Sequence, residues 1–320
     1  MSPSRRQMAR LLRGVGPCYR ARKVLSRAPK ALLPGFQLVA LMALSPQSPA
    51  GGITYQLLDD VGLVARPTWS PDGEWIAYAR NSGDGADLWK VWATGGEPVL
   101  LLDLPGAAAR PDWSPDGEWI AFTYLGPETT GQAIWKVRPD GEGAEHVVDT
   151  PESDLAPVWS PDQSQIAFYS PSDYDRLRVA DVATGDWTDR WAWPLLTSPT
   201  YSPDGTWISF TGKKPGQSGT TLYRIGVYAG DPEQIFGALG GNPLVEDPEW
   251  SPDGQYFLFA TAFAYGTGGY FDIHVWRNGG GAYAVSRVTF DPGNDRDATW
   301  SPDMTAIAYT AQTNESLWWS

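Results

Sequence analysis

Short apolar runs recur along the chain at intervals of 40 to 50 residues. They are apolar on both alternating faces and rich in aromatic residues and Ile, and they occupy residues 75–78, 119–122, 166–168, 207–210, 256–259 and 307–309. A strand that is apolar on both faces is covered on both faces. Because Gly and Pro punctuate these runs, the pattern predicts many short buried strands joined by tight turns.

Each apolar run follows a repeated motif, in which an aromatic residue precedes Ser-Pro-Asp. The aromatic positions are spaced by 44, 46, 42, 49 and 50 residues and are Trp69, Trp113, Trp159, Tyr201, Trp250 and Trp300. Further strands are predicted after each run, before the next motif begins. This period is typical of one four-stranded β-propeller blade.

The motif has a mechanical interpretation as a hairpin turn. Pro presets φ, Asp accepts local backbone hydrogen bonds, and the Gly that usually follows takes a left-handed conformation. Two repeats replace this Gly, with Gln163 and Met304. At an unchanged backbone each replacement costs about 1 kcal/mol, so the third and sixth blades are predicted to be locally weaker.

The two ends of the repeat array complement each other. The sixth repeat stops inside its predicted third strand, at 317–319, whereas residues 53–59 look like a fourth strand that belongs to no preceding repeat. Ring closure accounts for both observations and leaves no open sheet edge. The sequence therefore predicts an all-β, six-bladed propeller with four-stranded blades over residues 51–320, its last blade closed by the N-terminal strand.

The Trp-Ser-Pro-Asp-Gly-x-x-Ile-Ala-Phe units resemble the WD40-like (PD40) repeats of TolB-type propellers, which also occur in prolyl-oligopeptidase-like enzymes. The resemblance covers roughly residues 52–320 and implies a propeller in an envelope or extracellular setting. The α/β domain of a full TolB protein and the hydrolase domain of the peptidases have no counterpart here, and the G-x-S-x-G nucleophile motif is absent from the sequence. The resemblance thus implies the propeller module alone.

Charge separates residues 1–50 from the rest. They contain nine basic and no acidic side chains, which leaves 15 basic and 37 acidic residues elsewhere, a net charge of −22. The basic stretch precedes an apolar one, 31–44, so residues 1–50 are predicted to be a signal peptide or an anchor, with a basic tail on a cytosolic protein as the alternative. The acidic body disfavours nucleic acid and indicates cationic partners; membrane contact is expected only through the leader.

The chain contains few of the His and Cys residues that most often serve in catalysis, metal binding or disulfides. Two His residues and one Cys make a Ser-His-Asp triad, a histidine metal site or an internal disulfide unexpected. No cofactor or metal is expected. The position three before each motif aromatic is more informative because it does not repeat: it reads Arg66, Arg110, Ala156, Ser198, Asp247 and Asp297.

In a propeller that position lies at the entry to the innermost strand, near the mouth of the central channel. Arg110 and Asp247 are expected across the channel and Arg66 and Asp297 as neighbours. They predict either rim salt bridges or a polar binding site, which Glu246 and Arg296 would join. A second candidate contact surface is a glycine-flanked loop that contains the aromatic residues Phe263, Tyr265 and Tyr270.

These observations predict a monomeric, non-catalytic module that binds a protein or peptide partner in the periplasm or outside the cell. One alternative is a glycosidase- or lyase-type enzyme that uses a pair of acids at the channel mouth, with Asp247 and Asp297 as candidates. The other is a cytosolic scaffold.

Overall fold

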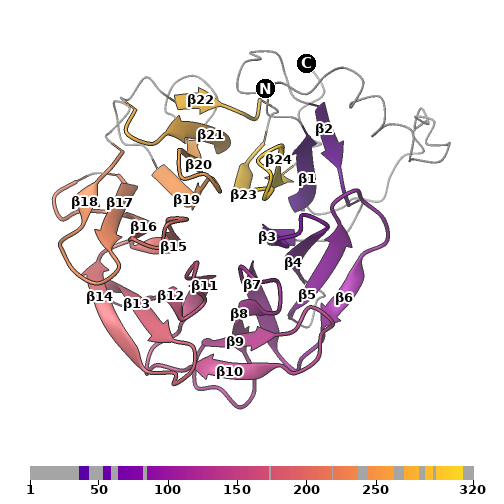
Figure 1. Ribbon diagram of the computed structural model, residues 1–320, viewed down its shortest axis with the longest axis horizontal. Coiled ribbons are helices and arrows are strands. Elements are labelled where there is room, and N and C mark those ends of the chain that lie inside the picture. The colour runs from indigo at the N-terminus through magenta and orange to yellow at the C-terminus, as the bar shows by residue number, and fades with distance from the viewer. Residues whose placement is uncertain are drawn as a thin grey trace. The chain divides into compact units, whose positions relative to one another are not determined.

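A computed structural model of the chain divides into two compact units, Met1–Leu33 and Pro34–Ser320. The structure describes residues 36–42, 53–58, 64–81, 85–172, 174–217, 219–236, 244–262, 270–280, 285–290 and 293–312, all in the second unit. These residues form an all-β propeller with four-stranded antiparallel blades, as the repeats predicted (Figure 1).

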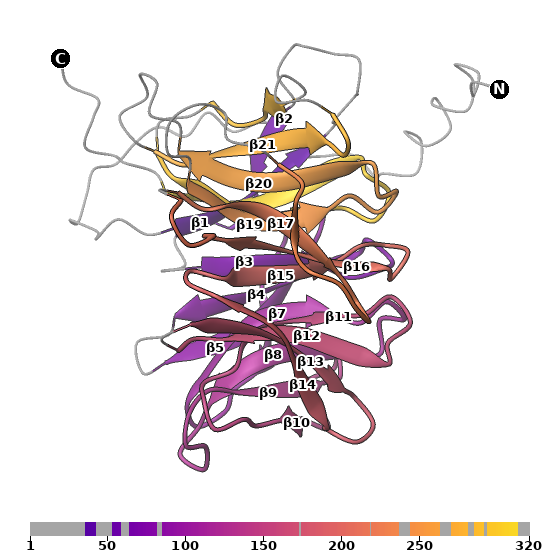
Figure 2. The ribbon, with the colours of Figure 1, turned by 90° about the vertical axis from the view of Figure 1, so that its left-hand side faces the viewer.

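Five blades each consist of four consecutive strands, with the first strand innermost and the fourth outermost (Figure 1). Figure 2 shows the same strands from the side. In chain order they are β3(Val64–Trp69), β4(Trp75–Asn81), β5(Ala86–Trp92), β6(Val99–Leu102); β7(Ala107–Trp113), β8(Ile120–Leu125), β9(Ala133–Val137), β10(Glu145–Val148); β11(Leu155–Trp159), β12(Gln165–Ser170), β13(Asp175–Asp181), β14(Trp187–Trp193); β15(Thr197–Tyr201), β16(Trp207–Gly212), β17(Thr221–Gly226), β18(Glu233–Gln234); and β19(Leu244–Trp250), β20(Tyr256–Ala262), β21(Asp272–Arg277), β22(Val285–Arg287).

A further four-stranded sheet combines both ends of the described chain. Its order is β2-β1-β24-β23, with β23(Asp295–Trp300) and β24(Ala306–Gln312) from the last repeat and β1(Phe36–Met42) and β2(Ile53–Gln56) from the N-terminal side. Strand β1 pairs antiparallel with β24, from Phe36 opposite Gln312 to Met42 opposite Ala306.

This composite sheet corrects the predicted closure in one respect. Residues 53–56 do occupy the fourth-strand position, but the third strand is β1, drawn from the apolar segment 31–44, and not residues 317–319. Residues 317–319 lie outside the described residues. The sequence reading missed β1 because the same apolar run also suits a secretory signal, so its pattern did not separate the two interpretations.

The innermost strands contact one another in a closed cycle. Each of β3, β7, β11, β15 and β19 contacts the next, β19 contacts β23, and β23 contacts β3. Leu58, which follows β2, packs in one apolar cluster with Val64, Tyr78 and Ala308, so the composite sheet and the β3–β6 blade share a core. The innermost strands of the six sheets line a central channel; Figure 1 shows these strands at the centre of the ring.

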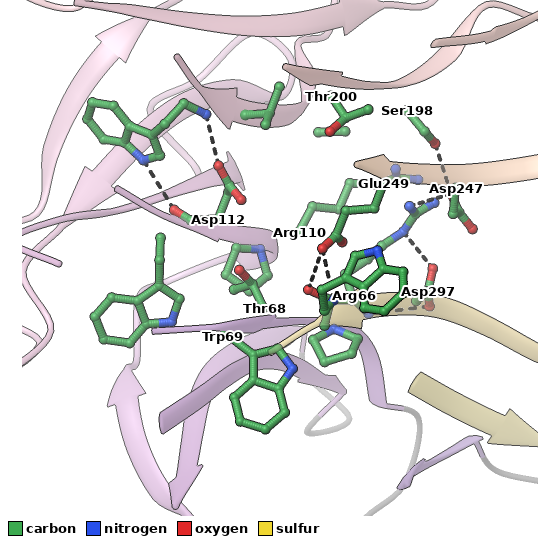
Figure 3. Close-up of a pocket in the computed structure, with 18 of the residues that line it drawn as sticks. Arg66, Thr68, Trp69, Arg110, Asp112, Ser198, Thr200, Asp247, Glu249 and Asp297 are labelled. Atoms are coloured by element: carbon green, nitrogen blue, oxygen red, sulfur yellow. Dashed lines mark hydrogen bonds and ion pairs between the residues drawn. The ribbon is translucent and has the colours of Figure 1, made fainter. Parts of the chain in front are cut away.

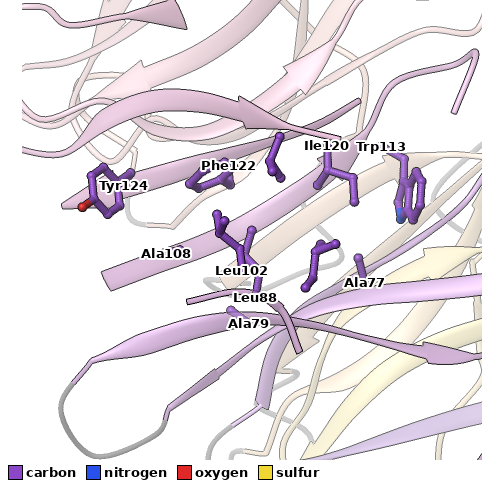
Figure 4. Packing of buried hydrophobic residues seen from close by; sticks show 11 residues of the cluster. Ala77, Ala79, Leu88, Leu102, Ala108, Trp113, Ile120, Phe122 and Tyr124 are labelled. Carbon is purple, nitrogen blue, oxygen red and sulfur yellow. The ribbon is translucent and has the colours of Figure 1, made fainter. Parts of the chain in front are cut away.

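Apolar side chains between adjacent blades form the core. In the cluster between the first two blades, Ala77 and Leu88 of one blade pack against Trp113, Ile120 and Phe122 of the next (Figure 4). The second strands of the blades, such as β8, β12 and β20, are almost wholly buried, as the two-sided apolar runs predicted. Burial of this kind contributes about 25 cal/mol per Å² of apolar surface.

The Ser-Pro-Asp turns cap their own hairpins. In the first repeat Ser70 Oγ donates to Asp72 Oδ1, the same carboxylate oxygen accepts the N–H of Glu74 at 2.9 Å, and Ser70 Oγ accepts the N–H of Trp75 at 2.8 Å. The same Ser–Asp hydrogen bond recurs in every repeat. The repeated aspartates are therefore turn-capping groups, as predicted.

The described residues contain neither a candidate membrane-spanning helix nor a candidate metal cluster. None of them forms a helix that is long and apolar enough to cross a membrane. Within the same part of the chain, no three His, Cys, Asp or Glu side chains lie together in a way that could hold a metal ion.

Candidate functional site

A cavity of about 420 Å³ lies in the central channel and is lined by all six innermost strands. It extends from the entry of each inner strand, where Arg66 and Arg110 lie, to the prolines of the turns that follow, such as Pro71 and Pro302. We call the entry end, formed by residues 66, 110, 156, 198, 247 and 297, the channel mouth. Figure 3 shows the mouth residues together with other side chains that line the cavity.

A β-bulge in every inner strand positions the mouth residues. The ladder shifts register between Ala65 and Thr68 of β3, and the corresponding shift recurs in each inner strand. At each bulge one residue has a positive φ, between 50° and 56°: Arg66, Arg110, Ala156, Ser198, Asp247 and Asp297. A bulge bends the strand and redirects a side chain.

Proline accompanies five of these six bulges. It follows the positive-φ residue at 67, 111, 157, 199 and 248, whereas Ala298 takes its place in β23. Proline has no N–H to contribute to the ladder and is tolerated at a bulge. A left-handed conformation costs a residue with a side chain on the order of 1–2 kcal/mol, yet none of the six is Gly. The positions therefore retain side chains at a cost to stability.

Arg66 is the centre of an ion-pair cluster at the mouth. Its guanidinium binds Asp247 through Nη1 and Asp297 through Nε, the latter at 2.8 Å, and the backbone N–H of Arg66 donates to Asp297 Oδ2 at 3.3 Å. Ser198 Oγ donates to Asp247 at 2.8 Å, and Thr310 Oγ1 donates to Asp297 at 3.1 Å. Four blades thus contribute to one hydrogen-bonded group.

The pKa values of this cluster follow from burial and from Arg66. Burial alone would raise the pKa of Asp247, but Arg66, Ser198 and Arg110 outweigh it and hold that pKa below its usual value. Burial raises the pKa of Asp297, and the charge of Arg66 opposes this rise. Burial alone would lower the pKa of Arg66, but the two carboxylates raise it overall.

Arg110 lies beside this cluster without an ion pair to any described residue. Its Nη1 is buried and has no hydrogen-bond partner, and its guanidinium lies 5.9 Å from the centroid of the Tyr169 ring. The positive charge of Arg66, followed by burial, lowers the pKa of Arg110. Arg66 and Asp297 are neighbours, as expected. Arg110 and Asp247 lie on β7 and β19, three positions apart in the cycle of six inner strands, so they are on opposite sides of the channel, as expected, and Asp247 binds Arg66.

Glu246 and Arg296, which were expected to join the mouth site, pair with each other and are not among the residues that line the cavity. Arg296 Nη1 donates to Glu246 at 2.7 Å, and the guanidinium lies 3.9 Å from the centroid of the Phe271 ring. Burial raises the pKa of Glu246, and Arg296 opposes the shift. Among the predicted loop aromatics, Tyr270 is half-buried; Phe263 and Tyr265 lie outside the described residues.

Two carboxyl groups deeper in the channel were missed by sequence reasoning. Asp112 and Glu249 lie two residues after Arg110 and Asp247 and line the same cavity. Burial raises the pKa of Asp112 to about 7 and that of Glu249 to about 8. The equivalent positions in the other blades are Thr68, Val158, Thr200 and Thr299. This position also fails to repeat, so the criterion that selected the mouth residues could have found it.

Each of these carboxyls also joins two blades. Asp112 of β7 accepts the backbone N–H of Trp159 in β11 at 2.8 Å. Glu249 of β19 accepts the N–H of Trp300 in β23 and the hydroxyl of Thr299, both at 3.0 Å. One carboxyl oxygen of each group is therefore committed to the neighbouring inner strand.

The comparisons agree with this architecture. Residues 110–262 match the family model described as the TolB beta propeller domain, PD40, which confirms the TolB-type repeats over that stretch. Comparison of the sequence with curated proteins gives no significant match.

Among solved structures, a putative TolB from Agrobacterium tumefaciens aligns with a TM-score of 0.72 and 21% identity, over 87% of this chain and 99% of that one. TolB from Acinetobacter baumannii aligns with a TM-score of 0.59 and 17% identity, over 86% of this chain and 64% of that one. An oligogalacturonate lyase in complex with manganese gives 0.53 and 12%, over 90% and 100%. At these identities the likeness concerns the fold alone.

Proposed function

We propose that this protein is a non-catalytic, six-bladed propeller module that binds a protein or peptide partner at its channel mouth, in the periplasm or outside the cell. One observation carries the proposal. An identical strained bulge in every inner strand presents side chains that differ from blade to blade, at the open end of a cavity of about 420 Å³. Strain that persists at a cleft is typical of binding sites.

The fold and charge support the same proposal. A TolB-type propeller is a scaffold whose function lies in the residues grafted on it. The mouth combines charged groups with room for an inserted segment, because Ala156 and Ser198 are short side chains on adjacent blades. The acidic body would favour a partner that is neutral or basic outside its contact with the mouth.

Site-specific photo-crosslinking tests the proposal. A photoreactive amino acid replaces Ala156 at the mouth in the full chain, expressed in the source cells. The control replaces Tyr228, which is 79% exposed and follows β17 at the opposite end of its blade. We expect a discrete crosslinked protein from position 156 that is missing from position 228. No adduct at 156, or the same adducts at both positions, would contradict partner binding at the mouth.

The location is tested separately through the N-terminus of the mature protein. A basic stretch before an apolar one supports export, but strand β1 lies inside that apolar stretch. Cleavage near residue 50 would remove β1 from the composite sheet, so we propose that an exported chain retains residues 36–42. Intact-mass analysis of the protein from a fractionated cell tests this, and recovery of the full chain from the cytosol would favour the scaffold alternative.

A second candidate function is a carboxylate-dependent glycosidase or lyase. It is favoured by Asp112 and Glu249, since a carboxyl group with a pKa near neutrality can serve as a general acid. The acids first suggested, Asp247 and Asp297, are both bound to Arg66 and fit this role poorly. Product formation from a panel of oligosaccharides and oligouronides, lost in D112N and E249Q, would support catalysis; no product from any member would exclude these substrates.

A further inference from the structure

We propose that Arg110 is the receptor for a single carboxylate group, supplied by the ligand that enters the channel mouth. This inference deepens the proposed function, on which it rests, by naming the chemistry that the mouth recognises. It starts from an imbalance among the mouth side chains: two cations and two anions are present, but both anions bind the same cation.

Both carboxylates at the mouth are bound by groups other than Arg110. Asp247 binds Arg66 and Ser198, and Asp297 binds Arg66, its backbone N–H and Thr310. The charges of both carboxylates favour the protonated form of Arg110, but among the described residues neither one contacts it in an ion pair or a hydrogen bond.

Among the described residues, the Arg110 side chain lacks hydrogen-bond acceptors that a ligand could supply. Its Nη1 is buried without a hydrogen-bond partner, and it lines the cavity beside another guanidinium. Buried polar groups are nearly always hydrogen-bonded, and a buried charge without a counter-ion is costly. The position could hold Gly at a lower backbone cost, since φ is 55° there. An incoming anion would satisfy the free N–H and offset the repulsion from Arg66.

The surroundings select a small monoanion over a phosphate or a polyanion. Arg66, Arg110 and the two carboxylates have no net charge together. A bound monoanion would bring the group to −1, whereas a phosphate dianion would bring it to −2. A dianion would meet Asp247 and Asp297 close by, and the acidic body repels polyanions further away. A carboxylate matches the planar fork of a guanidinium with two parallel hydrogen bonds.

The blades beside Arg110 leave space for such a group. Ala156 and Ser198 occupy the mouth positions of the next two blades, and neither side chain reaches far into the channel. The ring of Tyr169 lies on one side of the Arg110 guanidinium. A chain terminus or an acidic side chain of the partner would therefore reach Arg110 from the channel.

The test follows the arginine side-chain signals of the full-length protein labelled with ¹⁵N-arginine, during titration with small probes. N-acetylglycine represents a peptide C-terminus and N-acetylaspartate amide represents an acidic side chain, so the tighter of the two identifies the source of the carboxylate. N-acetylglycinamide and inorganic phosphate are the negative controls. We expect both carboxylates to shift the Arg110 signal, with neither control doing so.

Variants assign the binding to one side chain. R110Q is expected to weaken binding of the carboxylate probes at least tenfold, while R138Q, which removes an exposed Arg away from the channel, leaves it unchanged. Circular dichroism of R110Q checks that the fold is retained, and R110K, which keeps the charge without the fork, should bind with intermediate affinity. Any of four results would overturn the inference: binding of the amide at Arg110, binding of phosphate at Arg110, unchanged carboxylate binding by R110Q, or no shift of the Arg110 signal.

The outcome is separable from that of the proposed function. Carboxylate binding at Arg110 without any crosslinked partner at position 156 would remove the partner hypothesis and leave the anion site. A crosslinked partner that binds R110Q as tightly as the unaltered protein would keep the module and remove the anion site.

Discussion

Six residues with positive φ define this propeller at the residue scale. They occupy the same bulge in every inner strand, which shows that the conformation belongs to the blade, while their side chains differ and belong to the channel. A side chain at each of these six positions costs folding free energy that Gly would not cost. The charged residues at four of the positions are therefore the best candidates for function.

Arg66 and Arg110 are expected to differ sharply in their contribution to stability. R66Q leaves Asp247 and Asp297 buried without their counter-ion, so we expect the free energy of unfolding to fall by about 3–5 kcal/mol. R110Q removes an unpaired cation, and we expect a change within about 0.5 kcal/mol or a small gain. Urea denaturation measures both. Partial recovery of R66Q by a second change, D297N, is the control, and equal losses in R66Q and R110Q would contradict the assignment.

The two turns without Gly offer a second residue-scale prediction. Gln163 and Met304 have φ of 64° and 58°, so the glycine conformation is retained there. M304G should raise the free energy of unfolding by about 1 kcal/mol. Q163G should gain less, because the Gln163 amide nitrogen, in its donating orientation, lies 2.6 Å from Asp116 Oδ2. Thermal unfolding compares the two variants, and a larger gain in Q163G would show that the Asp116 contact is unimportant.

At the scale of the elements, the inner strands are joined by carboxyl groups as well as by apolar packing. Asp112 and Glu249 each accept a backbone N–H from the next inner strand. These contacts cross from one blade to another and depend on the ring. The sequence showed two acids among Thr and Val in this column, but only the structure revealed that both line the channel and link blades.

These carboxyls predict a pH dependence of stability. Burial raises the pKa of Asp112 to about 7 and of Glu249 to about 8, while both titrate near 4 in the unfolded chain. Between about pH 4 and 8 the folded protein holds protons that the unfolded chain has released, so stability falls as the pH rises through this window.

D112N and E249Q should flatten this decline. A pKa unit corresponds to about 1.4 kcal/mol, but the open channel reduces the effect, and we expect each variant to gain about 1–2 kcal/mol relative to the unaltered protein between about pH 5 and 8.5. Denaturation curves at several pH values measure the difference, with D231N, at an exposed site, as the control. Parallel stability curves for all four proteins would contradict burial of these groups.

At the scale of the whole molecule, the composite sheet brings both ends of the described chain together. Strand β1 covers the edge of β24 along seven residue pairs, from Phe36–Gln312 to Met42–Ala306, and β2 lies outside it. Without β1 the edge of β24 would be open, and an open edge promotes association with other chains.

Two truncations test this closure. Removal of residues 1–33 leaves β1 in place and should preserve a single cooperative unfolding transition. Removal of residues 1–52 deletes β1, and we expect the Tm to fall by roughly 5 °C or more, with dimers or larger species in light scattering. Equal Tm values and a monomeric state for both truncated proteins would show that β1 does not close the sheet.

The sequence by itself determined the blade. The motif spacing, the turn chemistry and the two-sided apolar runs are local patterns, and each repeat carries the same ones, so the propeller and the position of its inner strands could be predicted from them. The repeat position that holds Arg66, Arg110, Asp247 and Asp297 could also be identified from the sequence, because its residue type varies among repeats whose neighbouring motif residues are nearly constant.

Only the tertiary structure decided which of these groups meet. Residues from different blades are 40 to 50 positions apart or more, so their pairing depends on the curvature of the ring and on bulges that no single repeat reveals. In this geometry Asp247 and Asp297 both form ion pairs with Arg66, and the Nη1 of Arg110 has no hydrogen-bond partner among the described residues. It likewise placed residues 36–42 in a sheet, since the hydrogen bonds of a strand come from a partner that is distant in sequence.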